Sequence, residues 1–432
     1  LLYMKYKSKS RRQFIKNTSL SLGVFSIVPI NVLGKTYIPP SDKFTIGIIG
    51  TGAQGMGLSK GFNRISSSQV VAACDIDKVK YKRFISEFNK SYFEEYGKNN
   101  ISLFFSDNYF DILNKEDIDG IVVSTPDHWH AAVSIDSMKS GKHVYCEKPL
   151  SHTIEEGRAM VDTSKKYGKV LQTGSMQRSS SNFLNACQYI RNGYLGKISK
   201  VLVNVGNPGS YCKLPFEETP NTIDWDKWIG PADMRPYNKI LTSTSFYPDW
   251  RWYKEFGGGI LADWGAHMFD VVQWALGMDN SGPVKFIPPQ EPNAVKGLKM
   301  YYDNDVEVIH QDFCRGYGVR FIGSEGSLDV SRGFIDSKPE NIVKSEFKND
   351  DLKLYKSTNH LLDWITSIKN NTEPICNAEV GHRTASICHL SNIAYELRED
   401  LHWDPVNEKF LQNSKADLMR SKNYREPYSI NV

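Results

Sequence analysis

One stretch, TIGIIGTGAQGMG at residues 45–57, constrains the fold of this chain more than any other. Its first five residues are apolar or β-branched, which is typical of a buried strand. Gly50, Gly52 and Gly55 follow in the spacing G-x-G-x-x-G, and the residues after them can begin a helix. The three glycines permit a tight turn, close backbone approach to a pyrophosphate, and contact between helix and strand. The stretch therefore predicts a strand–turn–helix unit that holds a dinucleotide at the helix N-terminus.

A second apolar run, at residues 69–74, ends at Asp75. An acidic residue roughly 20 positions beyond such a turn can accept hydrogen bonds from the adenosine ribose. A carboxylate there would repel a 2′-phosphate, so Asp75 favours NAD over NADP. The alternative is that Asp75 is only a turn or helix-capping residue, but the glycines upstream favour the nucleotide.

The first 34 residues carry the pattern of an export signal. The segment SRRQFIK at residues 10–16 has paired arginines, and the apolar stretch after it, residues 20–33, is interrupted by polar residues and Pro29. That stretch is too short for a membrane span. The pattern resembles a twin-arginine signal at residues 1–34, followed by a linker at 35–43, and predicts a periplasmic location. An incidental basic, amphipathic terminus is the alternative.

The length of 432 residues favours two domains. The first sixteen residues hold six basic and no acidic side chains, which more than accounts for the net charge of +4, so the remainder is nearly neutral and indicates no nucleic-acid-binding surface. The seven cysteines form no C-x-x-C pair, which argues against a zinc site or a disulfide framework.

Strand and helix patterns alternate over residues 44–175, which predicts a parallel sheet covered on both faces. We expect its strands at residues 45–49, 69–74, 120–124, 142–146 and 169–173. Ligands bind beyond the carboxyl ends of such strands, where this chain places STPDHWH at 124–130 and EKP at 147–149. Residues 176–432 instead show long extended runs joined by short turns, which predicts an open, mostly antiparallel sheet. We expect the last helices to pack back on the first domain.

Two groups of side chains could carry chemistry. Lys148 follows a predicted strand, where a partly shielded amine can act as acid or base, although a surface lysine in a turn is the alternative.

Asp263 and His267 are four residues apart and share one face if the segment is helical. A carboxylate beside an imidazole fixes its tautomer, and the pair would suit removal of a proton from a hydroxyl. A capping Asp with a core His is the alternative. A metal is less favoured because no third ligand lies at a fitting spacing.

Six tryptophans, two tyrosines and an arginine cluster between positions 211 and 274 and could form a wall for the substrate. Aromatic faces with polar edges suit a sugar ring, although ordinary core packing also explains some of these residues, and we expect Trp274 in the core. The set is Trp225, Trp228, Trp250, Trp252, Trp264 and Trp274, together with Tyr211, Arg251 and Tyr253.

Taken together, six segments resemble the Gfo/Idh/MocA oxidoreductase family. They are GIIGTGAQG, CDID, STPDHWHA, HVYCEKPLS, TGSMQRSS and GGGILADWGAH, in the family's order over residues 44 to about 430. The resemblance implies a Rossmann domain at 44–175 and an α+β domain at 176–432, whose open sheet commonly forms an oligomer interface. It places the catalytic residues on Lys148, Asp263 and His267, and it implies a carbohydrate or cyclic polyol as substrate.

The predicted site has two further parts. The residues predicted to bind NAD are Gly50, Gly52, Gln54, Gly55, Met56, Asp75, Thr125, Asp127, His128, Trp129, His130, Glu147, Lys148 and Gln177. The residues predicted to bind the substrate are Arg178, Tyr211, Trp250, Arg251, Tyr253, Asp263 and His267. We predict that the site holds no metal. We also predict that the protein forms a homo-oligomer.

These predictions lead to one main function and several alternatives. His267, oriented by Asp263 and helped by Lys148, would remove a proton from a sugar hydroxyl while hydride passes to NAD. Because little free NAD exists outside the cytoplasm, we expect tightly held cofactor that is regenerated in the site. The resemblance offers two ways: transfer between two sugars, or redox-neutral glycoside hydrolysis through oxidation, elimination, hydration and reduction. A non-catalytic sugar-binding protein is the third alternative, which the presence of all three catalytic candidates disfavours.

Overall fold

The computed structural model describes residues 40–97, 102–245, 247–313 and 315–430. The predicted export signal and most of the predicted linker lie outside these residues, so they remain predictions. Within the described residues, no helix combines the length and the apolar character needed to cross a membrane.

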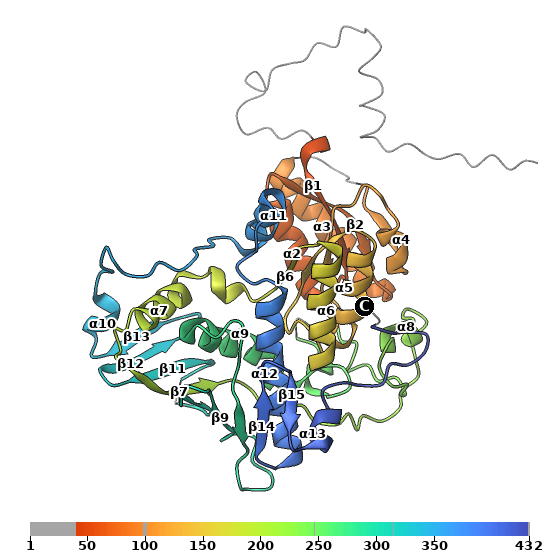
Figure 1. Ribbon diagram of the computed structural model, residues 1–432. Coiled ribbons are helices and arrows are strands. Elements are labelled where there is room, and N and C mark those ends of the chain that lie inside the picture. Colours follow the sequence, from red (N-terminus) through yellow and green to blue (C-terminus); the bar gives the residue numbers. More distant parts are fainter. Residues whose placement is uncertain (1–39, 98–101, 246, 314, 431–432) are drawn as a thin grey trace, which may run out of the picture.

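The first domain is built on a six-stranded parallel sheet with the order β3-β2-β1-β4-β5-β6, of which Figure 1 labels β1, β2 and β6. The strands are β1 Phe44–Ile49, β2 Ser68–Cys74, β3 Phe104–Ser106, β4 Gly120–Val123, β5 His143–Cys146 and β6 Leu171–Thr173. This confirms the predicted parallel sheet. The short edge strand β3 was not predicted, since its three residues give too little periodicity. The strand order reverses beside β1, so the carboxyl ends of β1 and β4 open a crevice there.

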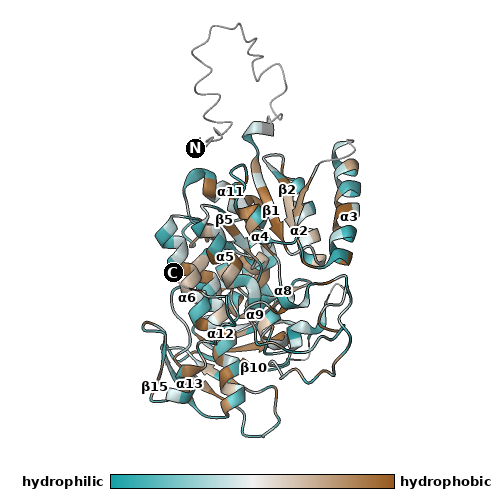
Figure 2. Cartoon of the chain, turned by 90° about the vertical axis from the view of Figure 1, so that its right-hand side faces the viewer, coloured by the Kyte–Doolittle hydropathy of each residue, from teal (hydrophilic) through white to brown (hydrophobic). Residues whose placement is uncertain are grey.

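Helices cover both faces of this sheet. They are α2 Ala53–Asn63, α3 Lys78–Tyr96, α4 Tyr109–Leu113, α5 His130–Lys139 and α6 Ile154–Tyr167. One core joins alternate strand residues to α5 and α6, and another joins the remaining strand residues to α2 and α3. Strands buried on both faces are predominantly apolar, as β1 and β2 are in Figure 2 apart from polar residues near their starts.

The second domain contains a nine-stranded sheet with the order β13-β12-β11-β7-β10-β9-β8-β14-β15. Its strands are β7 Ile198–Asn204, β8 Lys285–Ile287, β9 Lys299–Tyr301, β10 Glu307–His310, β11 Gly318–Gly323, β12 Gly326–Val330, β13 Ile335–Lys338, β14 Leu401–Asp404 and β15 Lys409–Leu411. Among the described strand pairs of this second sheet, only β7 and β10 are parallel. The sheet does not close on itself. The predicted open, mostly antiparallel sheet is therefore confirmed.

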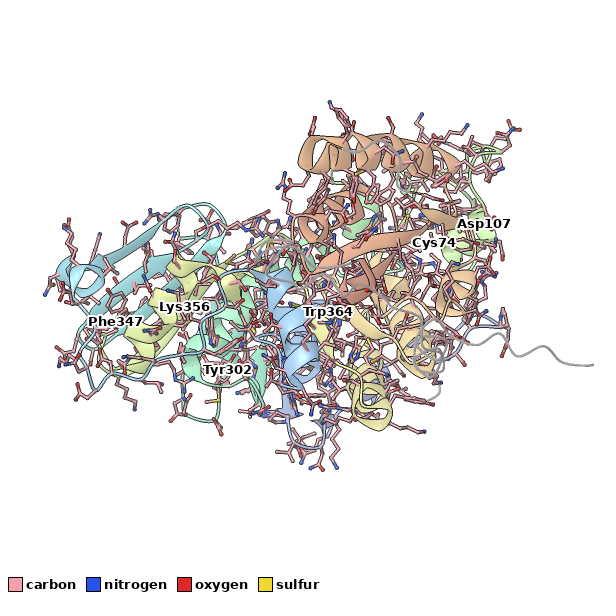
Figure 3. All side chains as sticks on the ribbon, turned by 90° about the horizontal axis from the view of Figure 1, so that it is seen from above. Cys74, Asp107, Tyr302, Phe347, Lys356 and Trp364 are labelled. Atoms are coloured by element: carbon pink, nitrogen blue, oxygen red, sulfur yellow. The ribbon has the colours of Figure 1, made fainter. Side chains whose placement is uncertain are left out.

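The second domain also contains helices, some of which contact the first domain. They are α7 Ser181–Arg191, α8 Trp225–Ile229, α9 Gly259–Leu276, α10 Asn341–Lys344, α11 His360–Asn370, α12 Ala378–Leu397 and α13 Ser414–Leu418. Helices α7, α9 and α12 form one apolar core with the sheet, and Trp274 lies in it as predicted. Helix α12 also packs on α6, and α11 packs on α2. Trp364 of α11 is fully buried where the domains meet (Figure 3), edge-on to Phe44 and Phe62 with ring centroids 5.4 and 5.6 Å away.

Candidate active site

A cavity of about 630 Å³ lies at the carboxyl edge of the parallel sheet. The ends of β1, β4 and β5 contribute Ile49, Ser124 and Glu147 to its lining. The second domain contributes residues of α9 and the loop after β12, among them His267 and Arg332. Cys74 and Asp107, labelled in Figure 3, line the part of the cavity within the first domain. The cavity thus joins the glycine turn to side chains of both domains.

At each of the three positions in the turn, the structure shows a different reason for glycine. Gly50 has φ +92°, and a Cβ there would lie 2.6 Å from the Ser124 carbonyl oxygen. A Cβ on Gly55 would lie 2.0 Å from the Gly50 carbonyl oxygen, so Gly55 permits α2 to pack on its own turn. A Cβ on Gly52 would meet nothing within 4 Å, and Gly52 lines the cavity. No side chain caps the N-terminus of α2, which leaves backbone N–H groups for an anionic ligand. The turn therefore fits a dinucleotide pyrophosphate.

Gly55 and Met56 do not themselves line the cavity. Met56 is buried in the core formed with α2 and α3, and its backbone N–H donates to the Gly52 carbonyl. The prediction that Met56 contacts the cofactor is therefore corrected: its side chain points to the core. Gln54 does line the cavity, and its amide donates to Glu147 at 2.8 Å.

Asp75 lines the cavity and also stabilises the turn. Its Oδ2 accepts hydrogen bonds from the backbone N–H and the hydroxyl of Thr51, both at 2.7 Å. Its Oδ1 accepts from the backbone N–H of Asp77 at 2.9 Å. The two interpretations of Asp75 are therefore compatible, because a carboxylate that fixes the turn also lies at the predicted ribose position.

The segment after β4 places four of its predicted residues on the cavity: Thr125, Asp127, Trp129 and His130. The hydroxyl of Thr125 is buried and has no partner among the described residues, which suits a ligand that supplies one. His128 is corrected. It lies outside the lining, and its Nε2 contacts the Trp228 carbonyl at 3.1 Å within the protein.

Lys148 and Asp263 meet across the domains. Lys148 Nζ donates to Asp263 Oδ1 at 2.7 Å and to the Asp263 carbonyl at 3.1 Å. Arg251 Nε also donates to Oδ1, at 3.2 Å, and the Tyr247 hydroxyl donates to Oδ2. Burial alone would raise the pKa of Asp263, but the neighbouring ammonium and guanidinium outweigh it and lower the pKa below its usual value. Asp263 is thus an ionised carboxylate that fixes the position of the lysine amine.

His267 lies one helical turn beyond Asp263, but no hydrogen bond joins them. The prediction that Asp263 orients His267 is therefore wrong, because Lys148, Arg251 and Tyr247 already occupy the carboxylate. Gln177 takes that place. With its amide oriented so that both polar atoms are satisfied, Gln177 donates to His267 Nδ1 at 2.5 Å. Burial, helped by Lys148 and Arg332, lowers the pKa of His267 well below its usual value, so the ring is neutral.

Two further carboxyl groups line this part of the cavity. Glu147 accepts hydrogen bonds from the Gln54 amide and, at 3.3 Å, from the backbone N–H of Lys148. Burial raises the pKa of Glu147, and it raises the pKa of Asp127 well above its usual value. Both groups therefore favour the protonated form more than an exposed carboxyl does, and either could donate a hydrogen bond to a ligand.

Three residues predicted to bind the substrate lie outside the cavity lining. Arg178 is buried, and both Asp270 and Asp279 accept hydrogen bonds from its guanidinium at 2.7 Å, so it has no capacity for a substrate. The Tyr211 hydroxyl donates to Glu396 at 2.7 Å, and Tyr253 packs beside the aromatic cluster around Trp228. These three predictions are corrected. Of the tryptophans, Trp228, Trp250 and Trp264 line the cavity together with Trp129.

Sequence reasoning missed several lining residues. Tyr247 and Arg332 both touch residues of the charged centre, and nothing in their local sequence indicates it. The C-terminal tail adds Pro427 and Tyr428 to the lining, and the Tyr428 ring lies edge-on to Trp129 at 5.2 Å. These segments are far apart in the sequence, so no spacing pattern could connect them.

A parallel dinucleotide-binding domain, whose cavity receives a carboxylate and an imidazole from a second, open-sheet domain, defines a class of two-domain nucleotide-dependent enzymes. The comparison with known protein families identifies the family within this class. Residues 44–175 match "Oxidoreductase family, NAD-binding Rossmann fold", and residues 206–430 match "Oxidoreductase family, C-terminal alpha/beta domain". The chain therefore belongs to the Gfo/Idh/MocA oxidoreductase family.

Curated relatives share a shorter part of the chain. "Glycosyl hydrolase family 109 protein 2" of Shewanella sp. (strain ANA-3) is 35% identical over 130 residues, which is 30% of this chain and 27% of that protein. "Alpha-N-acetylgalactosaminidase" of Shewanella oneidensis is 29% identical over 193 residues, 42% of this chain and 40% of that protein. The matches thus span less than half the length of these relatives.

Solved structures share the fold over most of the chain. An aldose-aldose oxidoreductase from Caulobacter crescentus aligns with a TM-score of 0.58 and 18% identity, covering 83% of this chain and 99% of that one. Scyllo-inositol dehydrogenase from Lactobacillus casei, solved with NAD(H) and scyllo-inositol, aligns with a TM-score of 0.56 and 17% identity at the same coverage. At these identities the likeness shows the fold.

Proposed function

We propose that this protein is an NAD-dependent oxidoreductase that oxidises a hydroxyl of a sugar or glycoside and holds its NAD tightly. The observation that carries the proposal is the meeting of the Lys148–Asp263 pair and a neutral His267 in the cavity that the glycine turn also lines. Asp75 supports NAD rather than NADP, because its carboxylate lines the cavity near the turn.

The residues of the chain have separate tasks in this proposal. Bound NAD would supply the hydride acceptor for oxidation of the substrate carbon. Lys148, fixed by Asp263, donates hydrogen bonds to the substrate oxygen and stabilises negative charge that develops there. His267 is neutral, so one of its ring nitrogens carries a lone pair that can accept the hydroxyl proton. Glu147 and Gln54, bonded to each other beside Lys148, would orient the nicotinamide end of the cofactor.

The relatives named as glycosyl hydrolases favour a second candidate function. In it, the same oxidation is followed by loss of the glycosidic substituent, addition of water and return of the hydride. The residues have the same tasks, since oxidation is the first step of both reactions. The difference lies in whether reduced cofactor and keto sugar accumulate.

A panel of 4-nitrophenyl glycosides tests both candidates. The absorbance of reduced nicotinamide and the release of 4-nitrophenol are followed together in the purified protein. Nitrophenol release without net reduction indicates hydrolysis, and reduction without release indicates dehydrogenation. Lys148→Met and His267→Gln are expected to lower the rate by roughly 10²–10⁴-fold, the usual size of an acid–base contribution. Full turnover in either variant would remove that residue from the mechanism. A protein that binds sugars but never reduces nucleotide would be a binding protein.

We also propose that the protein is exported folded, with NAD already bound, and acts in the periplasm. The twin-arginine pattern at residues 10–16 supports this. Changing Arg11 and Arg12 to lysine is expected to retain the protein in the cytoplasm, as measured by cell fractionation. Unchanged distribution would contradict the proposed route.

A further inference from the structure

Arg332 occupies an unusual place at the edge of the active site. It lies in the turn after β12 and lines the cavity, and it is partly exposed to solvent. Its guanidinium stacks over the Trp264 ring at 4.7 Å. Its Nε and Nη2 donate to the side-chain oxygen of Gln177 at 2.9 and 2.8 Å, and its Nη2 lies 3.3 Å from His267 Nε2. It therefore borders the proposed base directly.

The charges around Arg332 do not balance. Lys148 and Arg251 both pair with Asp263, which is one carboxylate for two cations. Arg332 forms no ion pair with any of the residues that the structure describes. Burial raises the pKa of Glu147 and Asp127, so these carboxyls supply less negative charge than exposed ones would. Arg332 is thus a cation at the edge of the cavity that pairs with no carboxylate among the described residues.

The hydrogen bonds around His267 point the same way. Because Gln177 donates to Nδ1, the proton of the neutral ring belongs on Nε2. Arg332 Nη2 lies 3.3 Å from Nε2 and donates to it only in the other tautomer; in this tautomer both nitrogens are donors. Neighbouring donors that face one cavity without an acceptor are favourable for a negatively charged oxygen.

We propose that the substrate is an anionic carbohydrate, whose carboxylate or sulfate group binds to Arg332. This inference rests on the proposed function and names its substrate class. A guanidinium suits such a group because its fork of N–H donors matches two oxygens of a carboxylate or sulfate.

Binding of that anion would also prepare His267. While Arg332 holds the Gln177 oxygen, the Gln177 amide donates to Nδ1 and the lone pair is at the wrong nitrogen. Once the anion engages the guanidinium, the Gln177 amide can turn, and the ring can exchange its proton with water, losing the one on Nε2 and taking one up on Nδ1, where the Gln177 oxygen accepts a hydrogen bond from it. The lone pair is then on Nε2, where it can accept the hydroxyl proton. Arg332 thus acts as a specificity residue and, through Gln177, as a positioning residue.

Matched pairs of glycosides test the inference. Each pair has the same ring stereochemistry, and its members differ at C6: 4-nitrophenyl hexosides against the corresponding uronides, with 6-sulfated hexosides as a third arm. Reduction of nucleotide and nitrophenol release are measured with the holoenzyme, and thermal shifts with the free sugar acids report binding without turnover. The variants are Arg332→Gln, Arg332→Lys and, as control, Lys344→Gln, which removes a charge from the exposed helix α10.

The expected result is a preference for one charged arm over the neutral hexoside of roughly 10- to 100-fold in kcat/KM, as for a charge-assisted hydrogen bond. Arg332→Gln should abolish that preference through a much larger loss with the charged than with the neutral substrate, Arg332→Lys should retain part of it, and Lys344→Gln all of it. Added salt should weaken the preference in wild type. A preference for the uronides would identify the anion as a carboxylate, and a preference for the 6-sulfated hexosides would identify it as a sulfate.

Two results would overturn the inference. One is equal rates with charged and neutral members in wild type, and the other is an equal loss for both in Arg332→Gln. The thermal shifts separate this from a failure of the proposed function. If no glycoside reacts but sugar acids stabilise wild type and not Arg332→Gln, the anion site stands and the oxidoreductase proposal falls. If neither turnover nor a selective shift occurs, both fall.

Discussion

Replacing Asp263 with asparagine is expected to destabilise the protein by about 3 kcal/mol near neutral pH. The carboxylate holds Lys148 and Arg251, whose side chains are only 14% and 16% exposed. Removing one partner of a buried ion pair costs about 3–5 kcal/mol, because the remaining charge stays away from water. The asparagine oxygen can still accept hydrogen bonds from both cations, so the low end of that range applies.

The effect should have a defined pH dependence. Burial would raise the pKa of Asp263, but Lys148 and Arg251 outweigh it, so the folded-state pKa lies below the unfolded value of about 3.9. Such a group stabilises the fold at all pH values above the unfolded pKa and loses this contribution as the pH falls through the folded pKa. The difference between wild type and Asp263→Asn should therefore be constant above about pH 5 and shrink below about pH 4.

Urea unfolding, followed by tryptophan fluorescence at one fixed NAD concentration, measures these differences, since bound ligand adds to stability. A cycle with Lys148→Met isolates the pair. With the lysine gone, Asp263 retains Arg251 and Tyr247, so the cost of Asp263→Asn should fall by at least about 1 kcal/mol. Additive costs, within about 0.5 kcal/mol, would show that Lys148 and Asp263 do not interact and would refute the reasoning.

Three further predictions follow from other parts of the site. Gly55→Ala should abolish nucleotide binding in calorimetry, because its Cβ would lie 2.0 Å from the Gly50 carbonyl oxygen, whereas Gly57→Ala on the same helix has open space and should bind normally. Asp75→Asn should keep the turn but reduce the preference for NAD over NADP in competition binding by roughly tenfold, the effect of about 1.4 kcal/mol; an unchanged preference would contradict the ribose assignment. Lys422→Met removes the amine that bonds Glu156 at 2.8 Å and His152 at 2.9 Å, and so loosens the tail that carries Tyr428 to the cavity. It should speed NAD release in a fluorescence chase, and an unchanged rate would show that the tail does not retain the cofactor.

Much of the first domain could be predicted because its signals are local. An apolar strand, three spaced glycines and an acidic strand end lie within about 30 residues of each other, and each has a direct backbone reason. The second sheet followed from alternation and turns in the same way. The edge strand β3 escaped because three residues carry no period.

The site was predictable only where a local pattern reflected a contact. Helical spacing placed Asp263 and His267 on one face, but it could not show that cations from other segments would occupy the carboxylate. Arg178 lies next to Gln177 in the chain and yet turns away to the buried Asp270 and to Asp279. Arg332 follows the β11–β12 hairpin, and the position of that hairpin depends on the pairing of β11 with β7, which lies far earlier in the chain.

The correction at Asp263 changes how the site should respond to substitution. Asp263 holds the Lys148 amine and is itself fixed by Arg251 and Tyr247, while Gln177 and Arg332 hold the His267 ring. The two catalytic candidates therefore have separate supports, so a change in one support need not displace the other group. Effects on turnover of Asp263→Asn and Gln177→Leu should accordingly be additive in free energy. If Asp263 instead oriented the imidazole, the two substitutions would act on the same ring, and the double variant would lose less activity than the sum of the single ones.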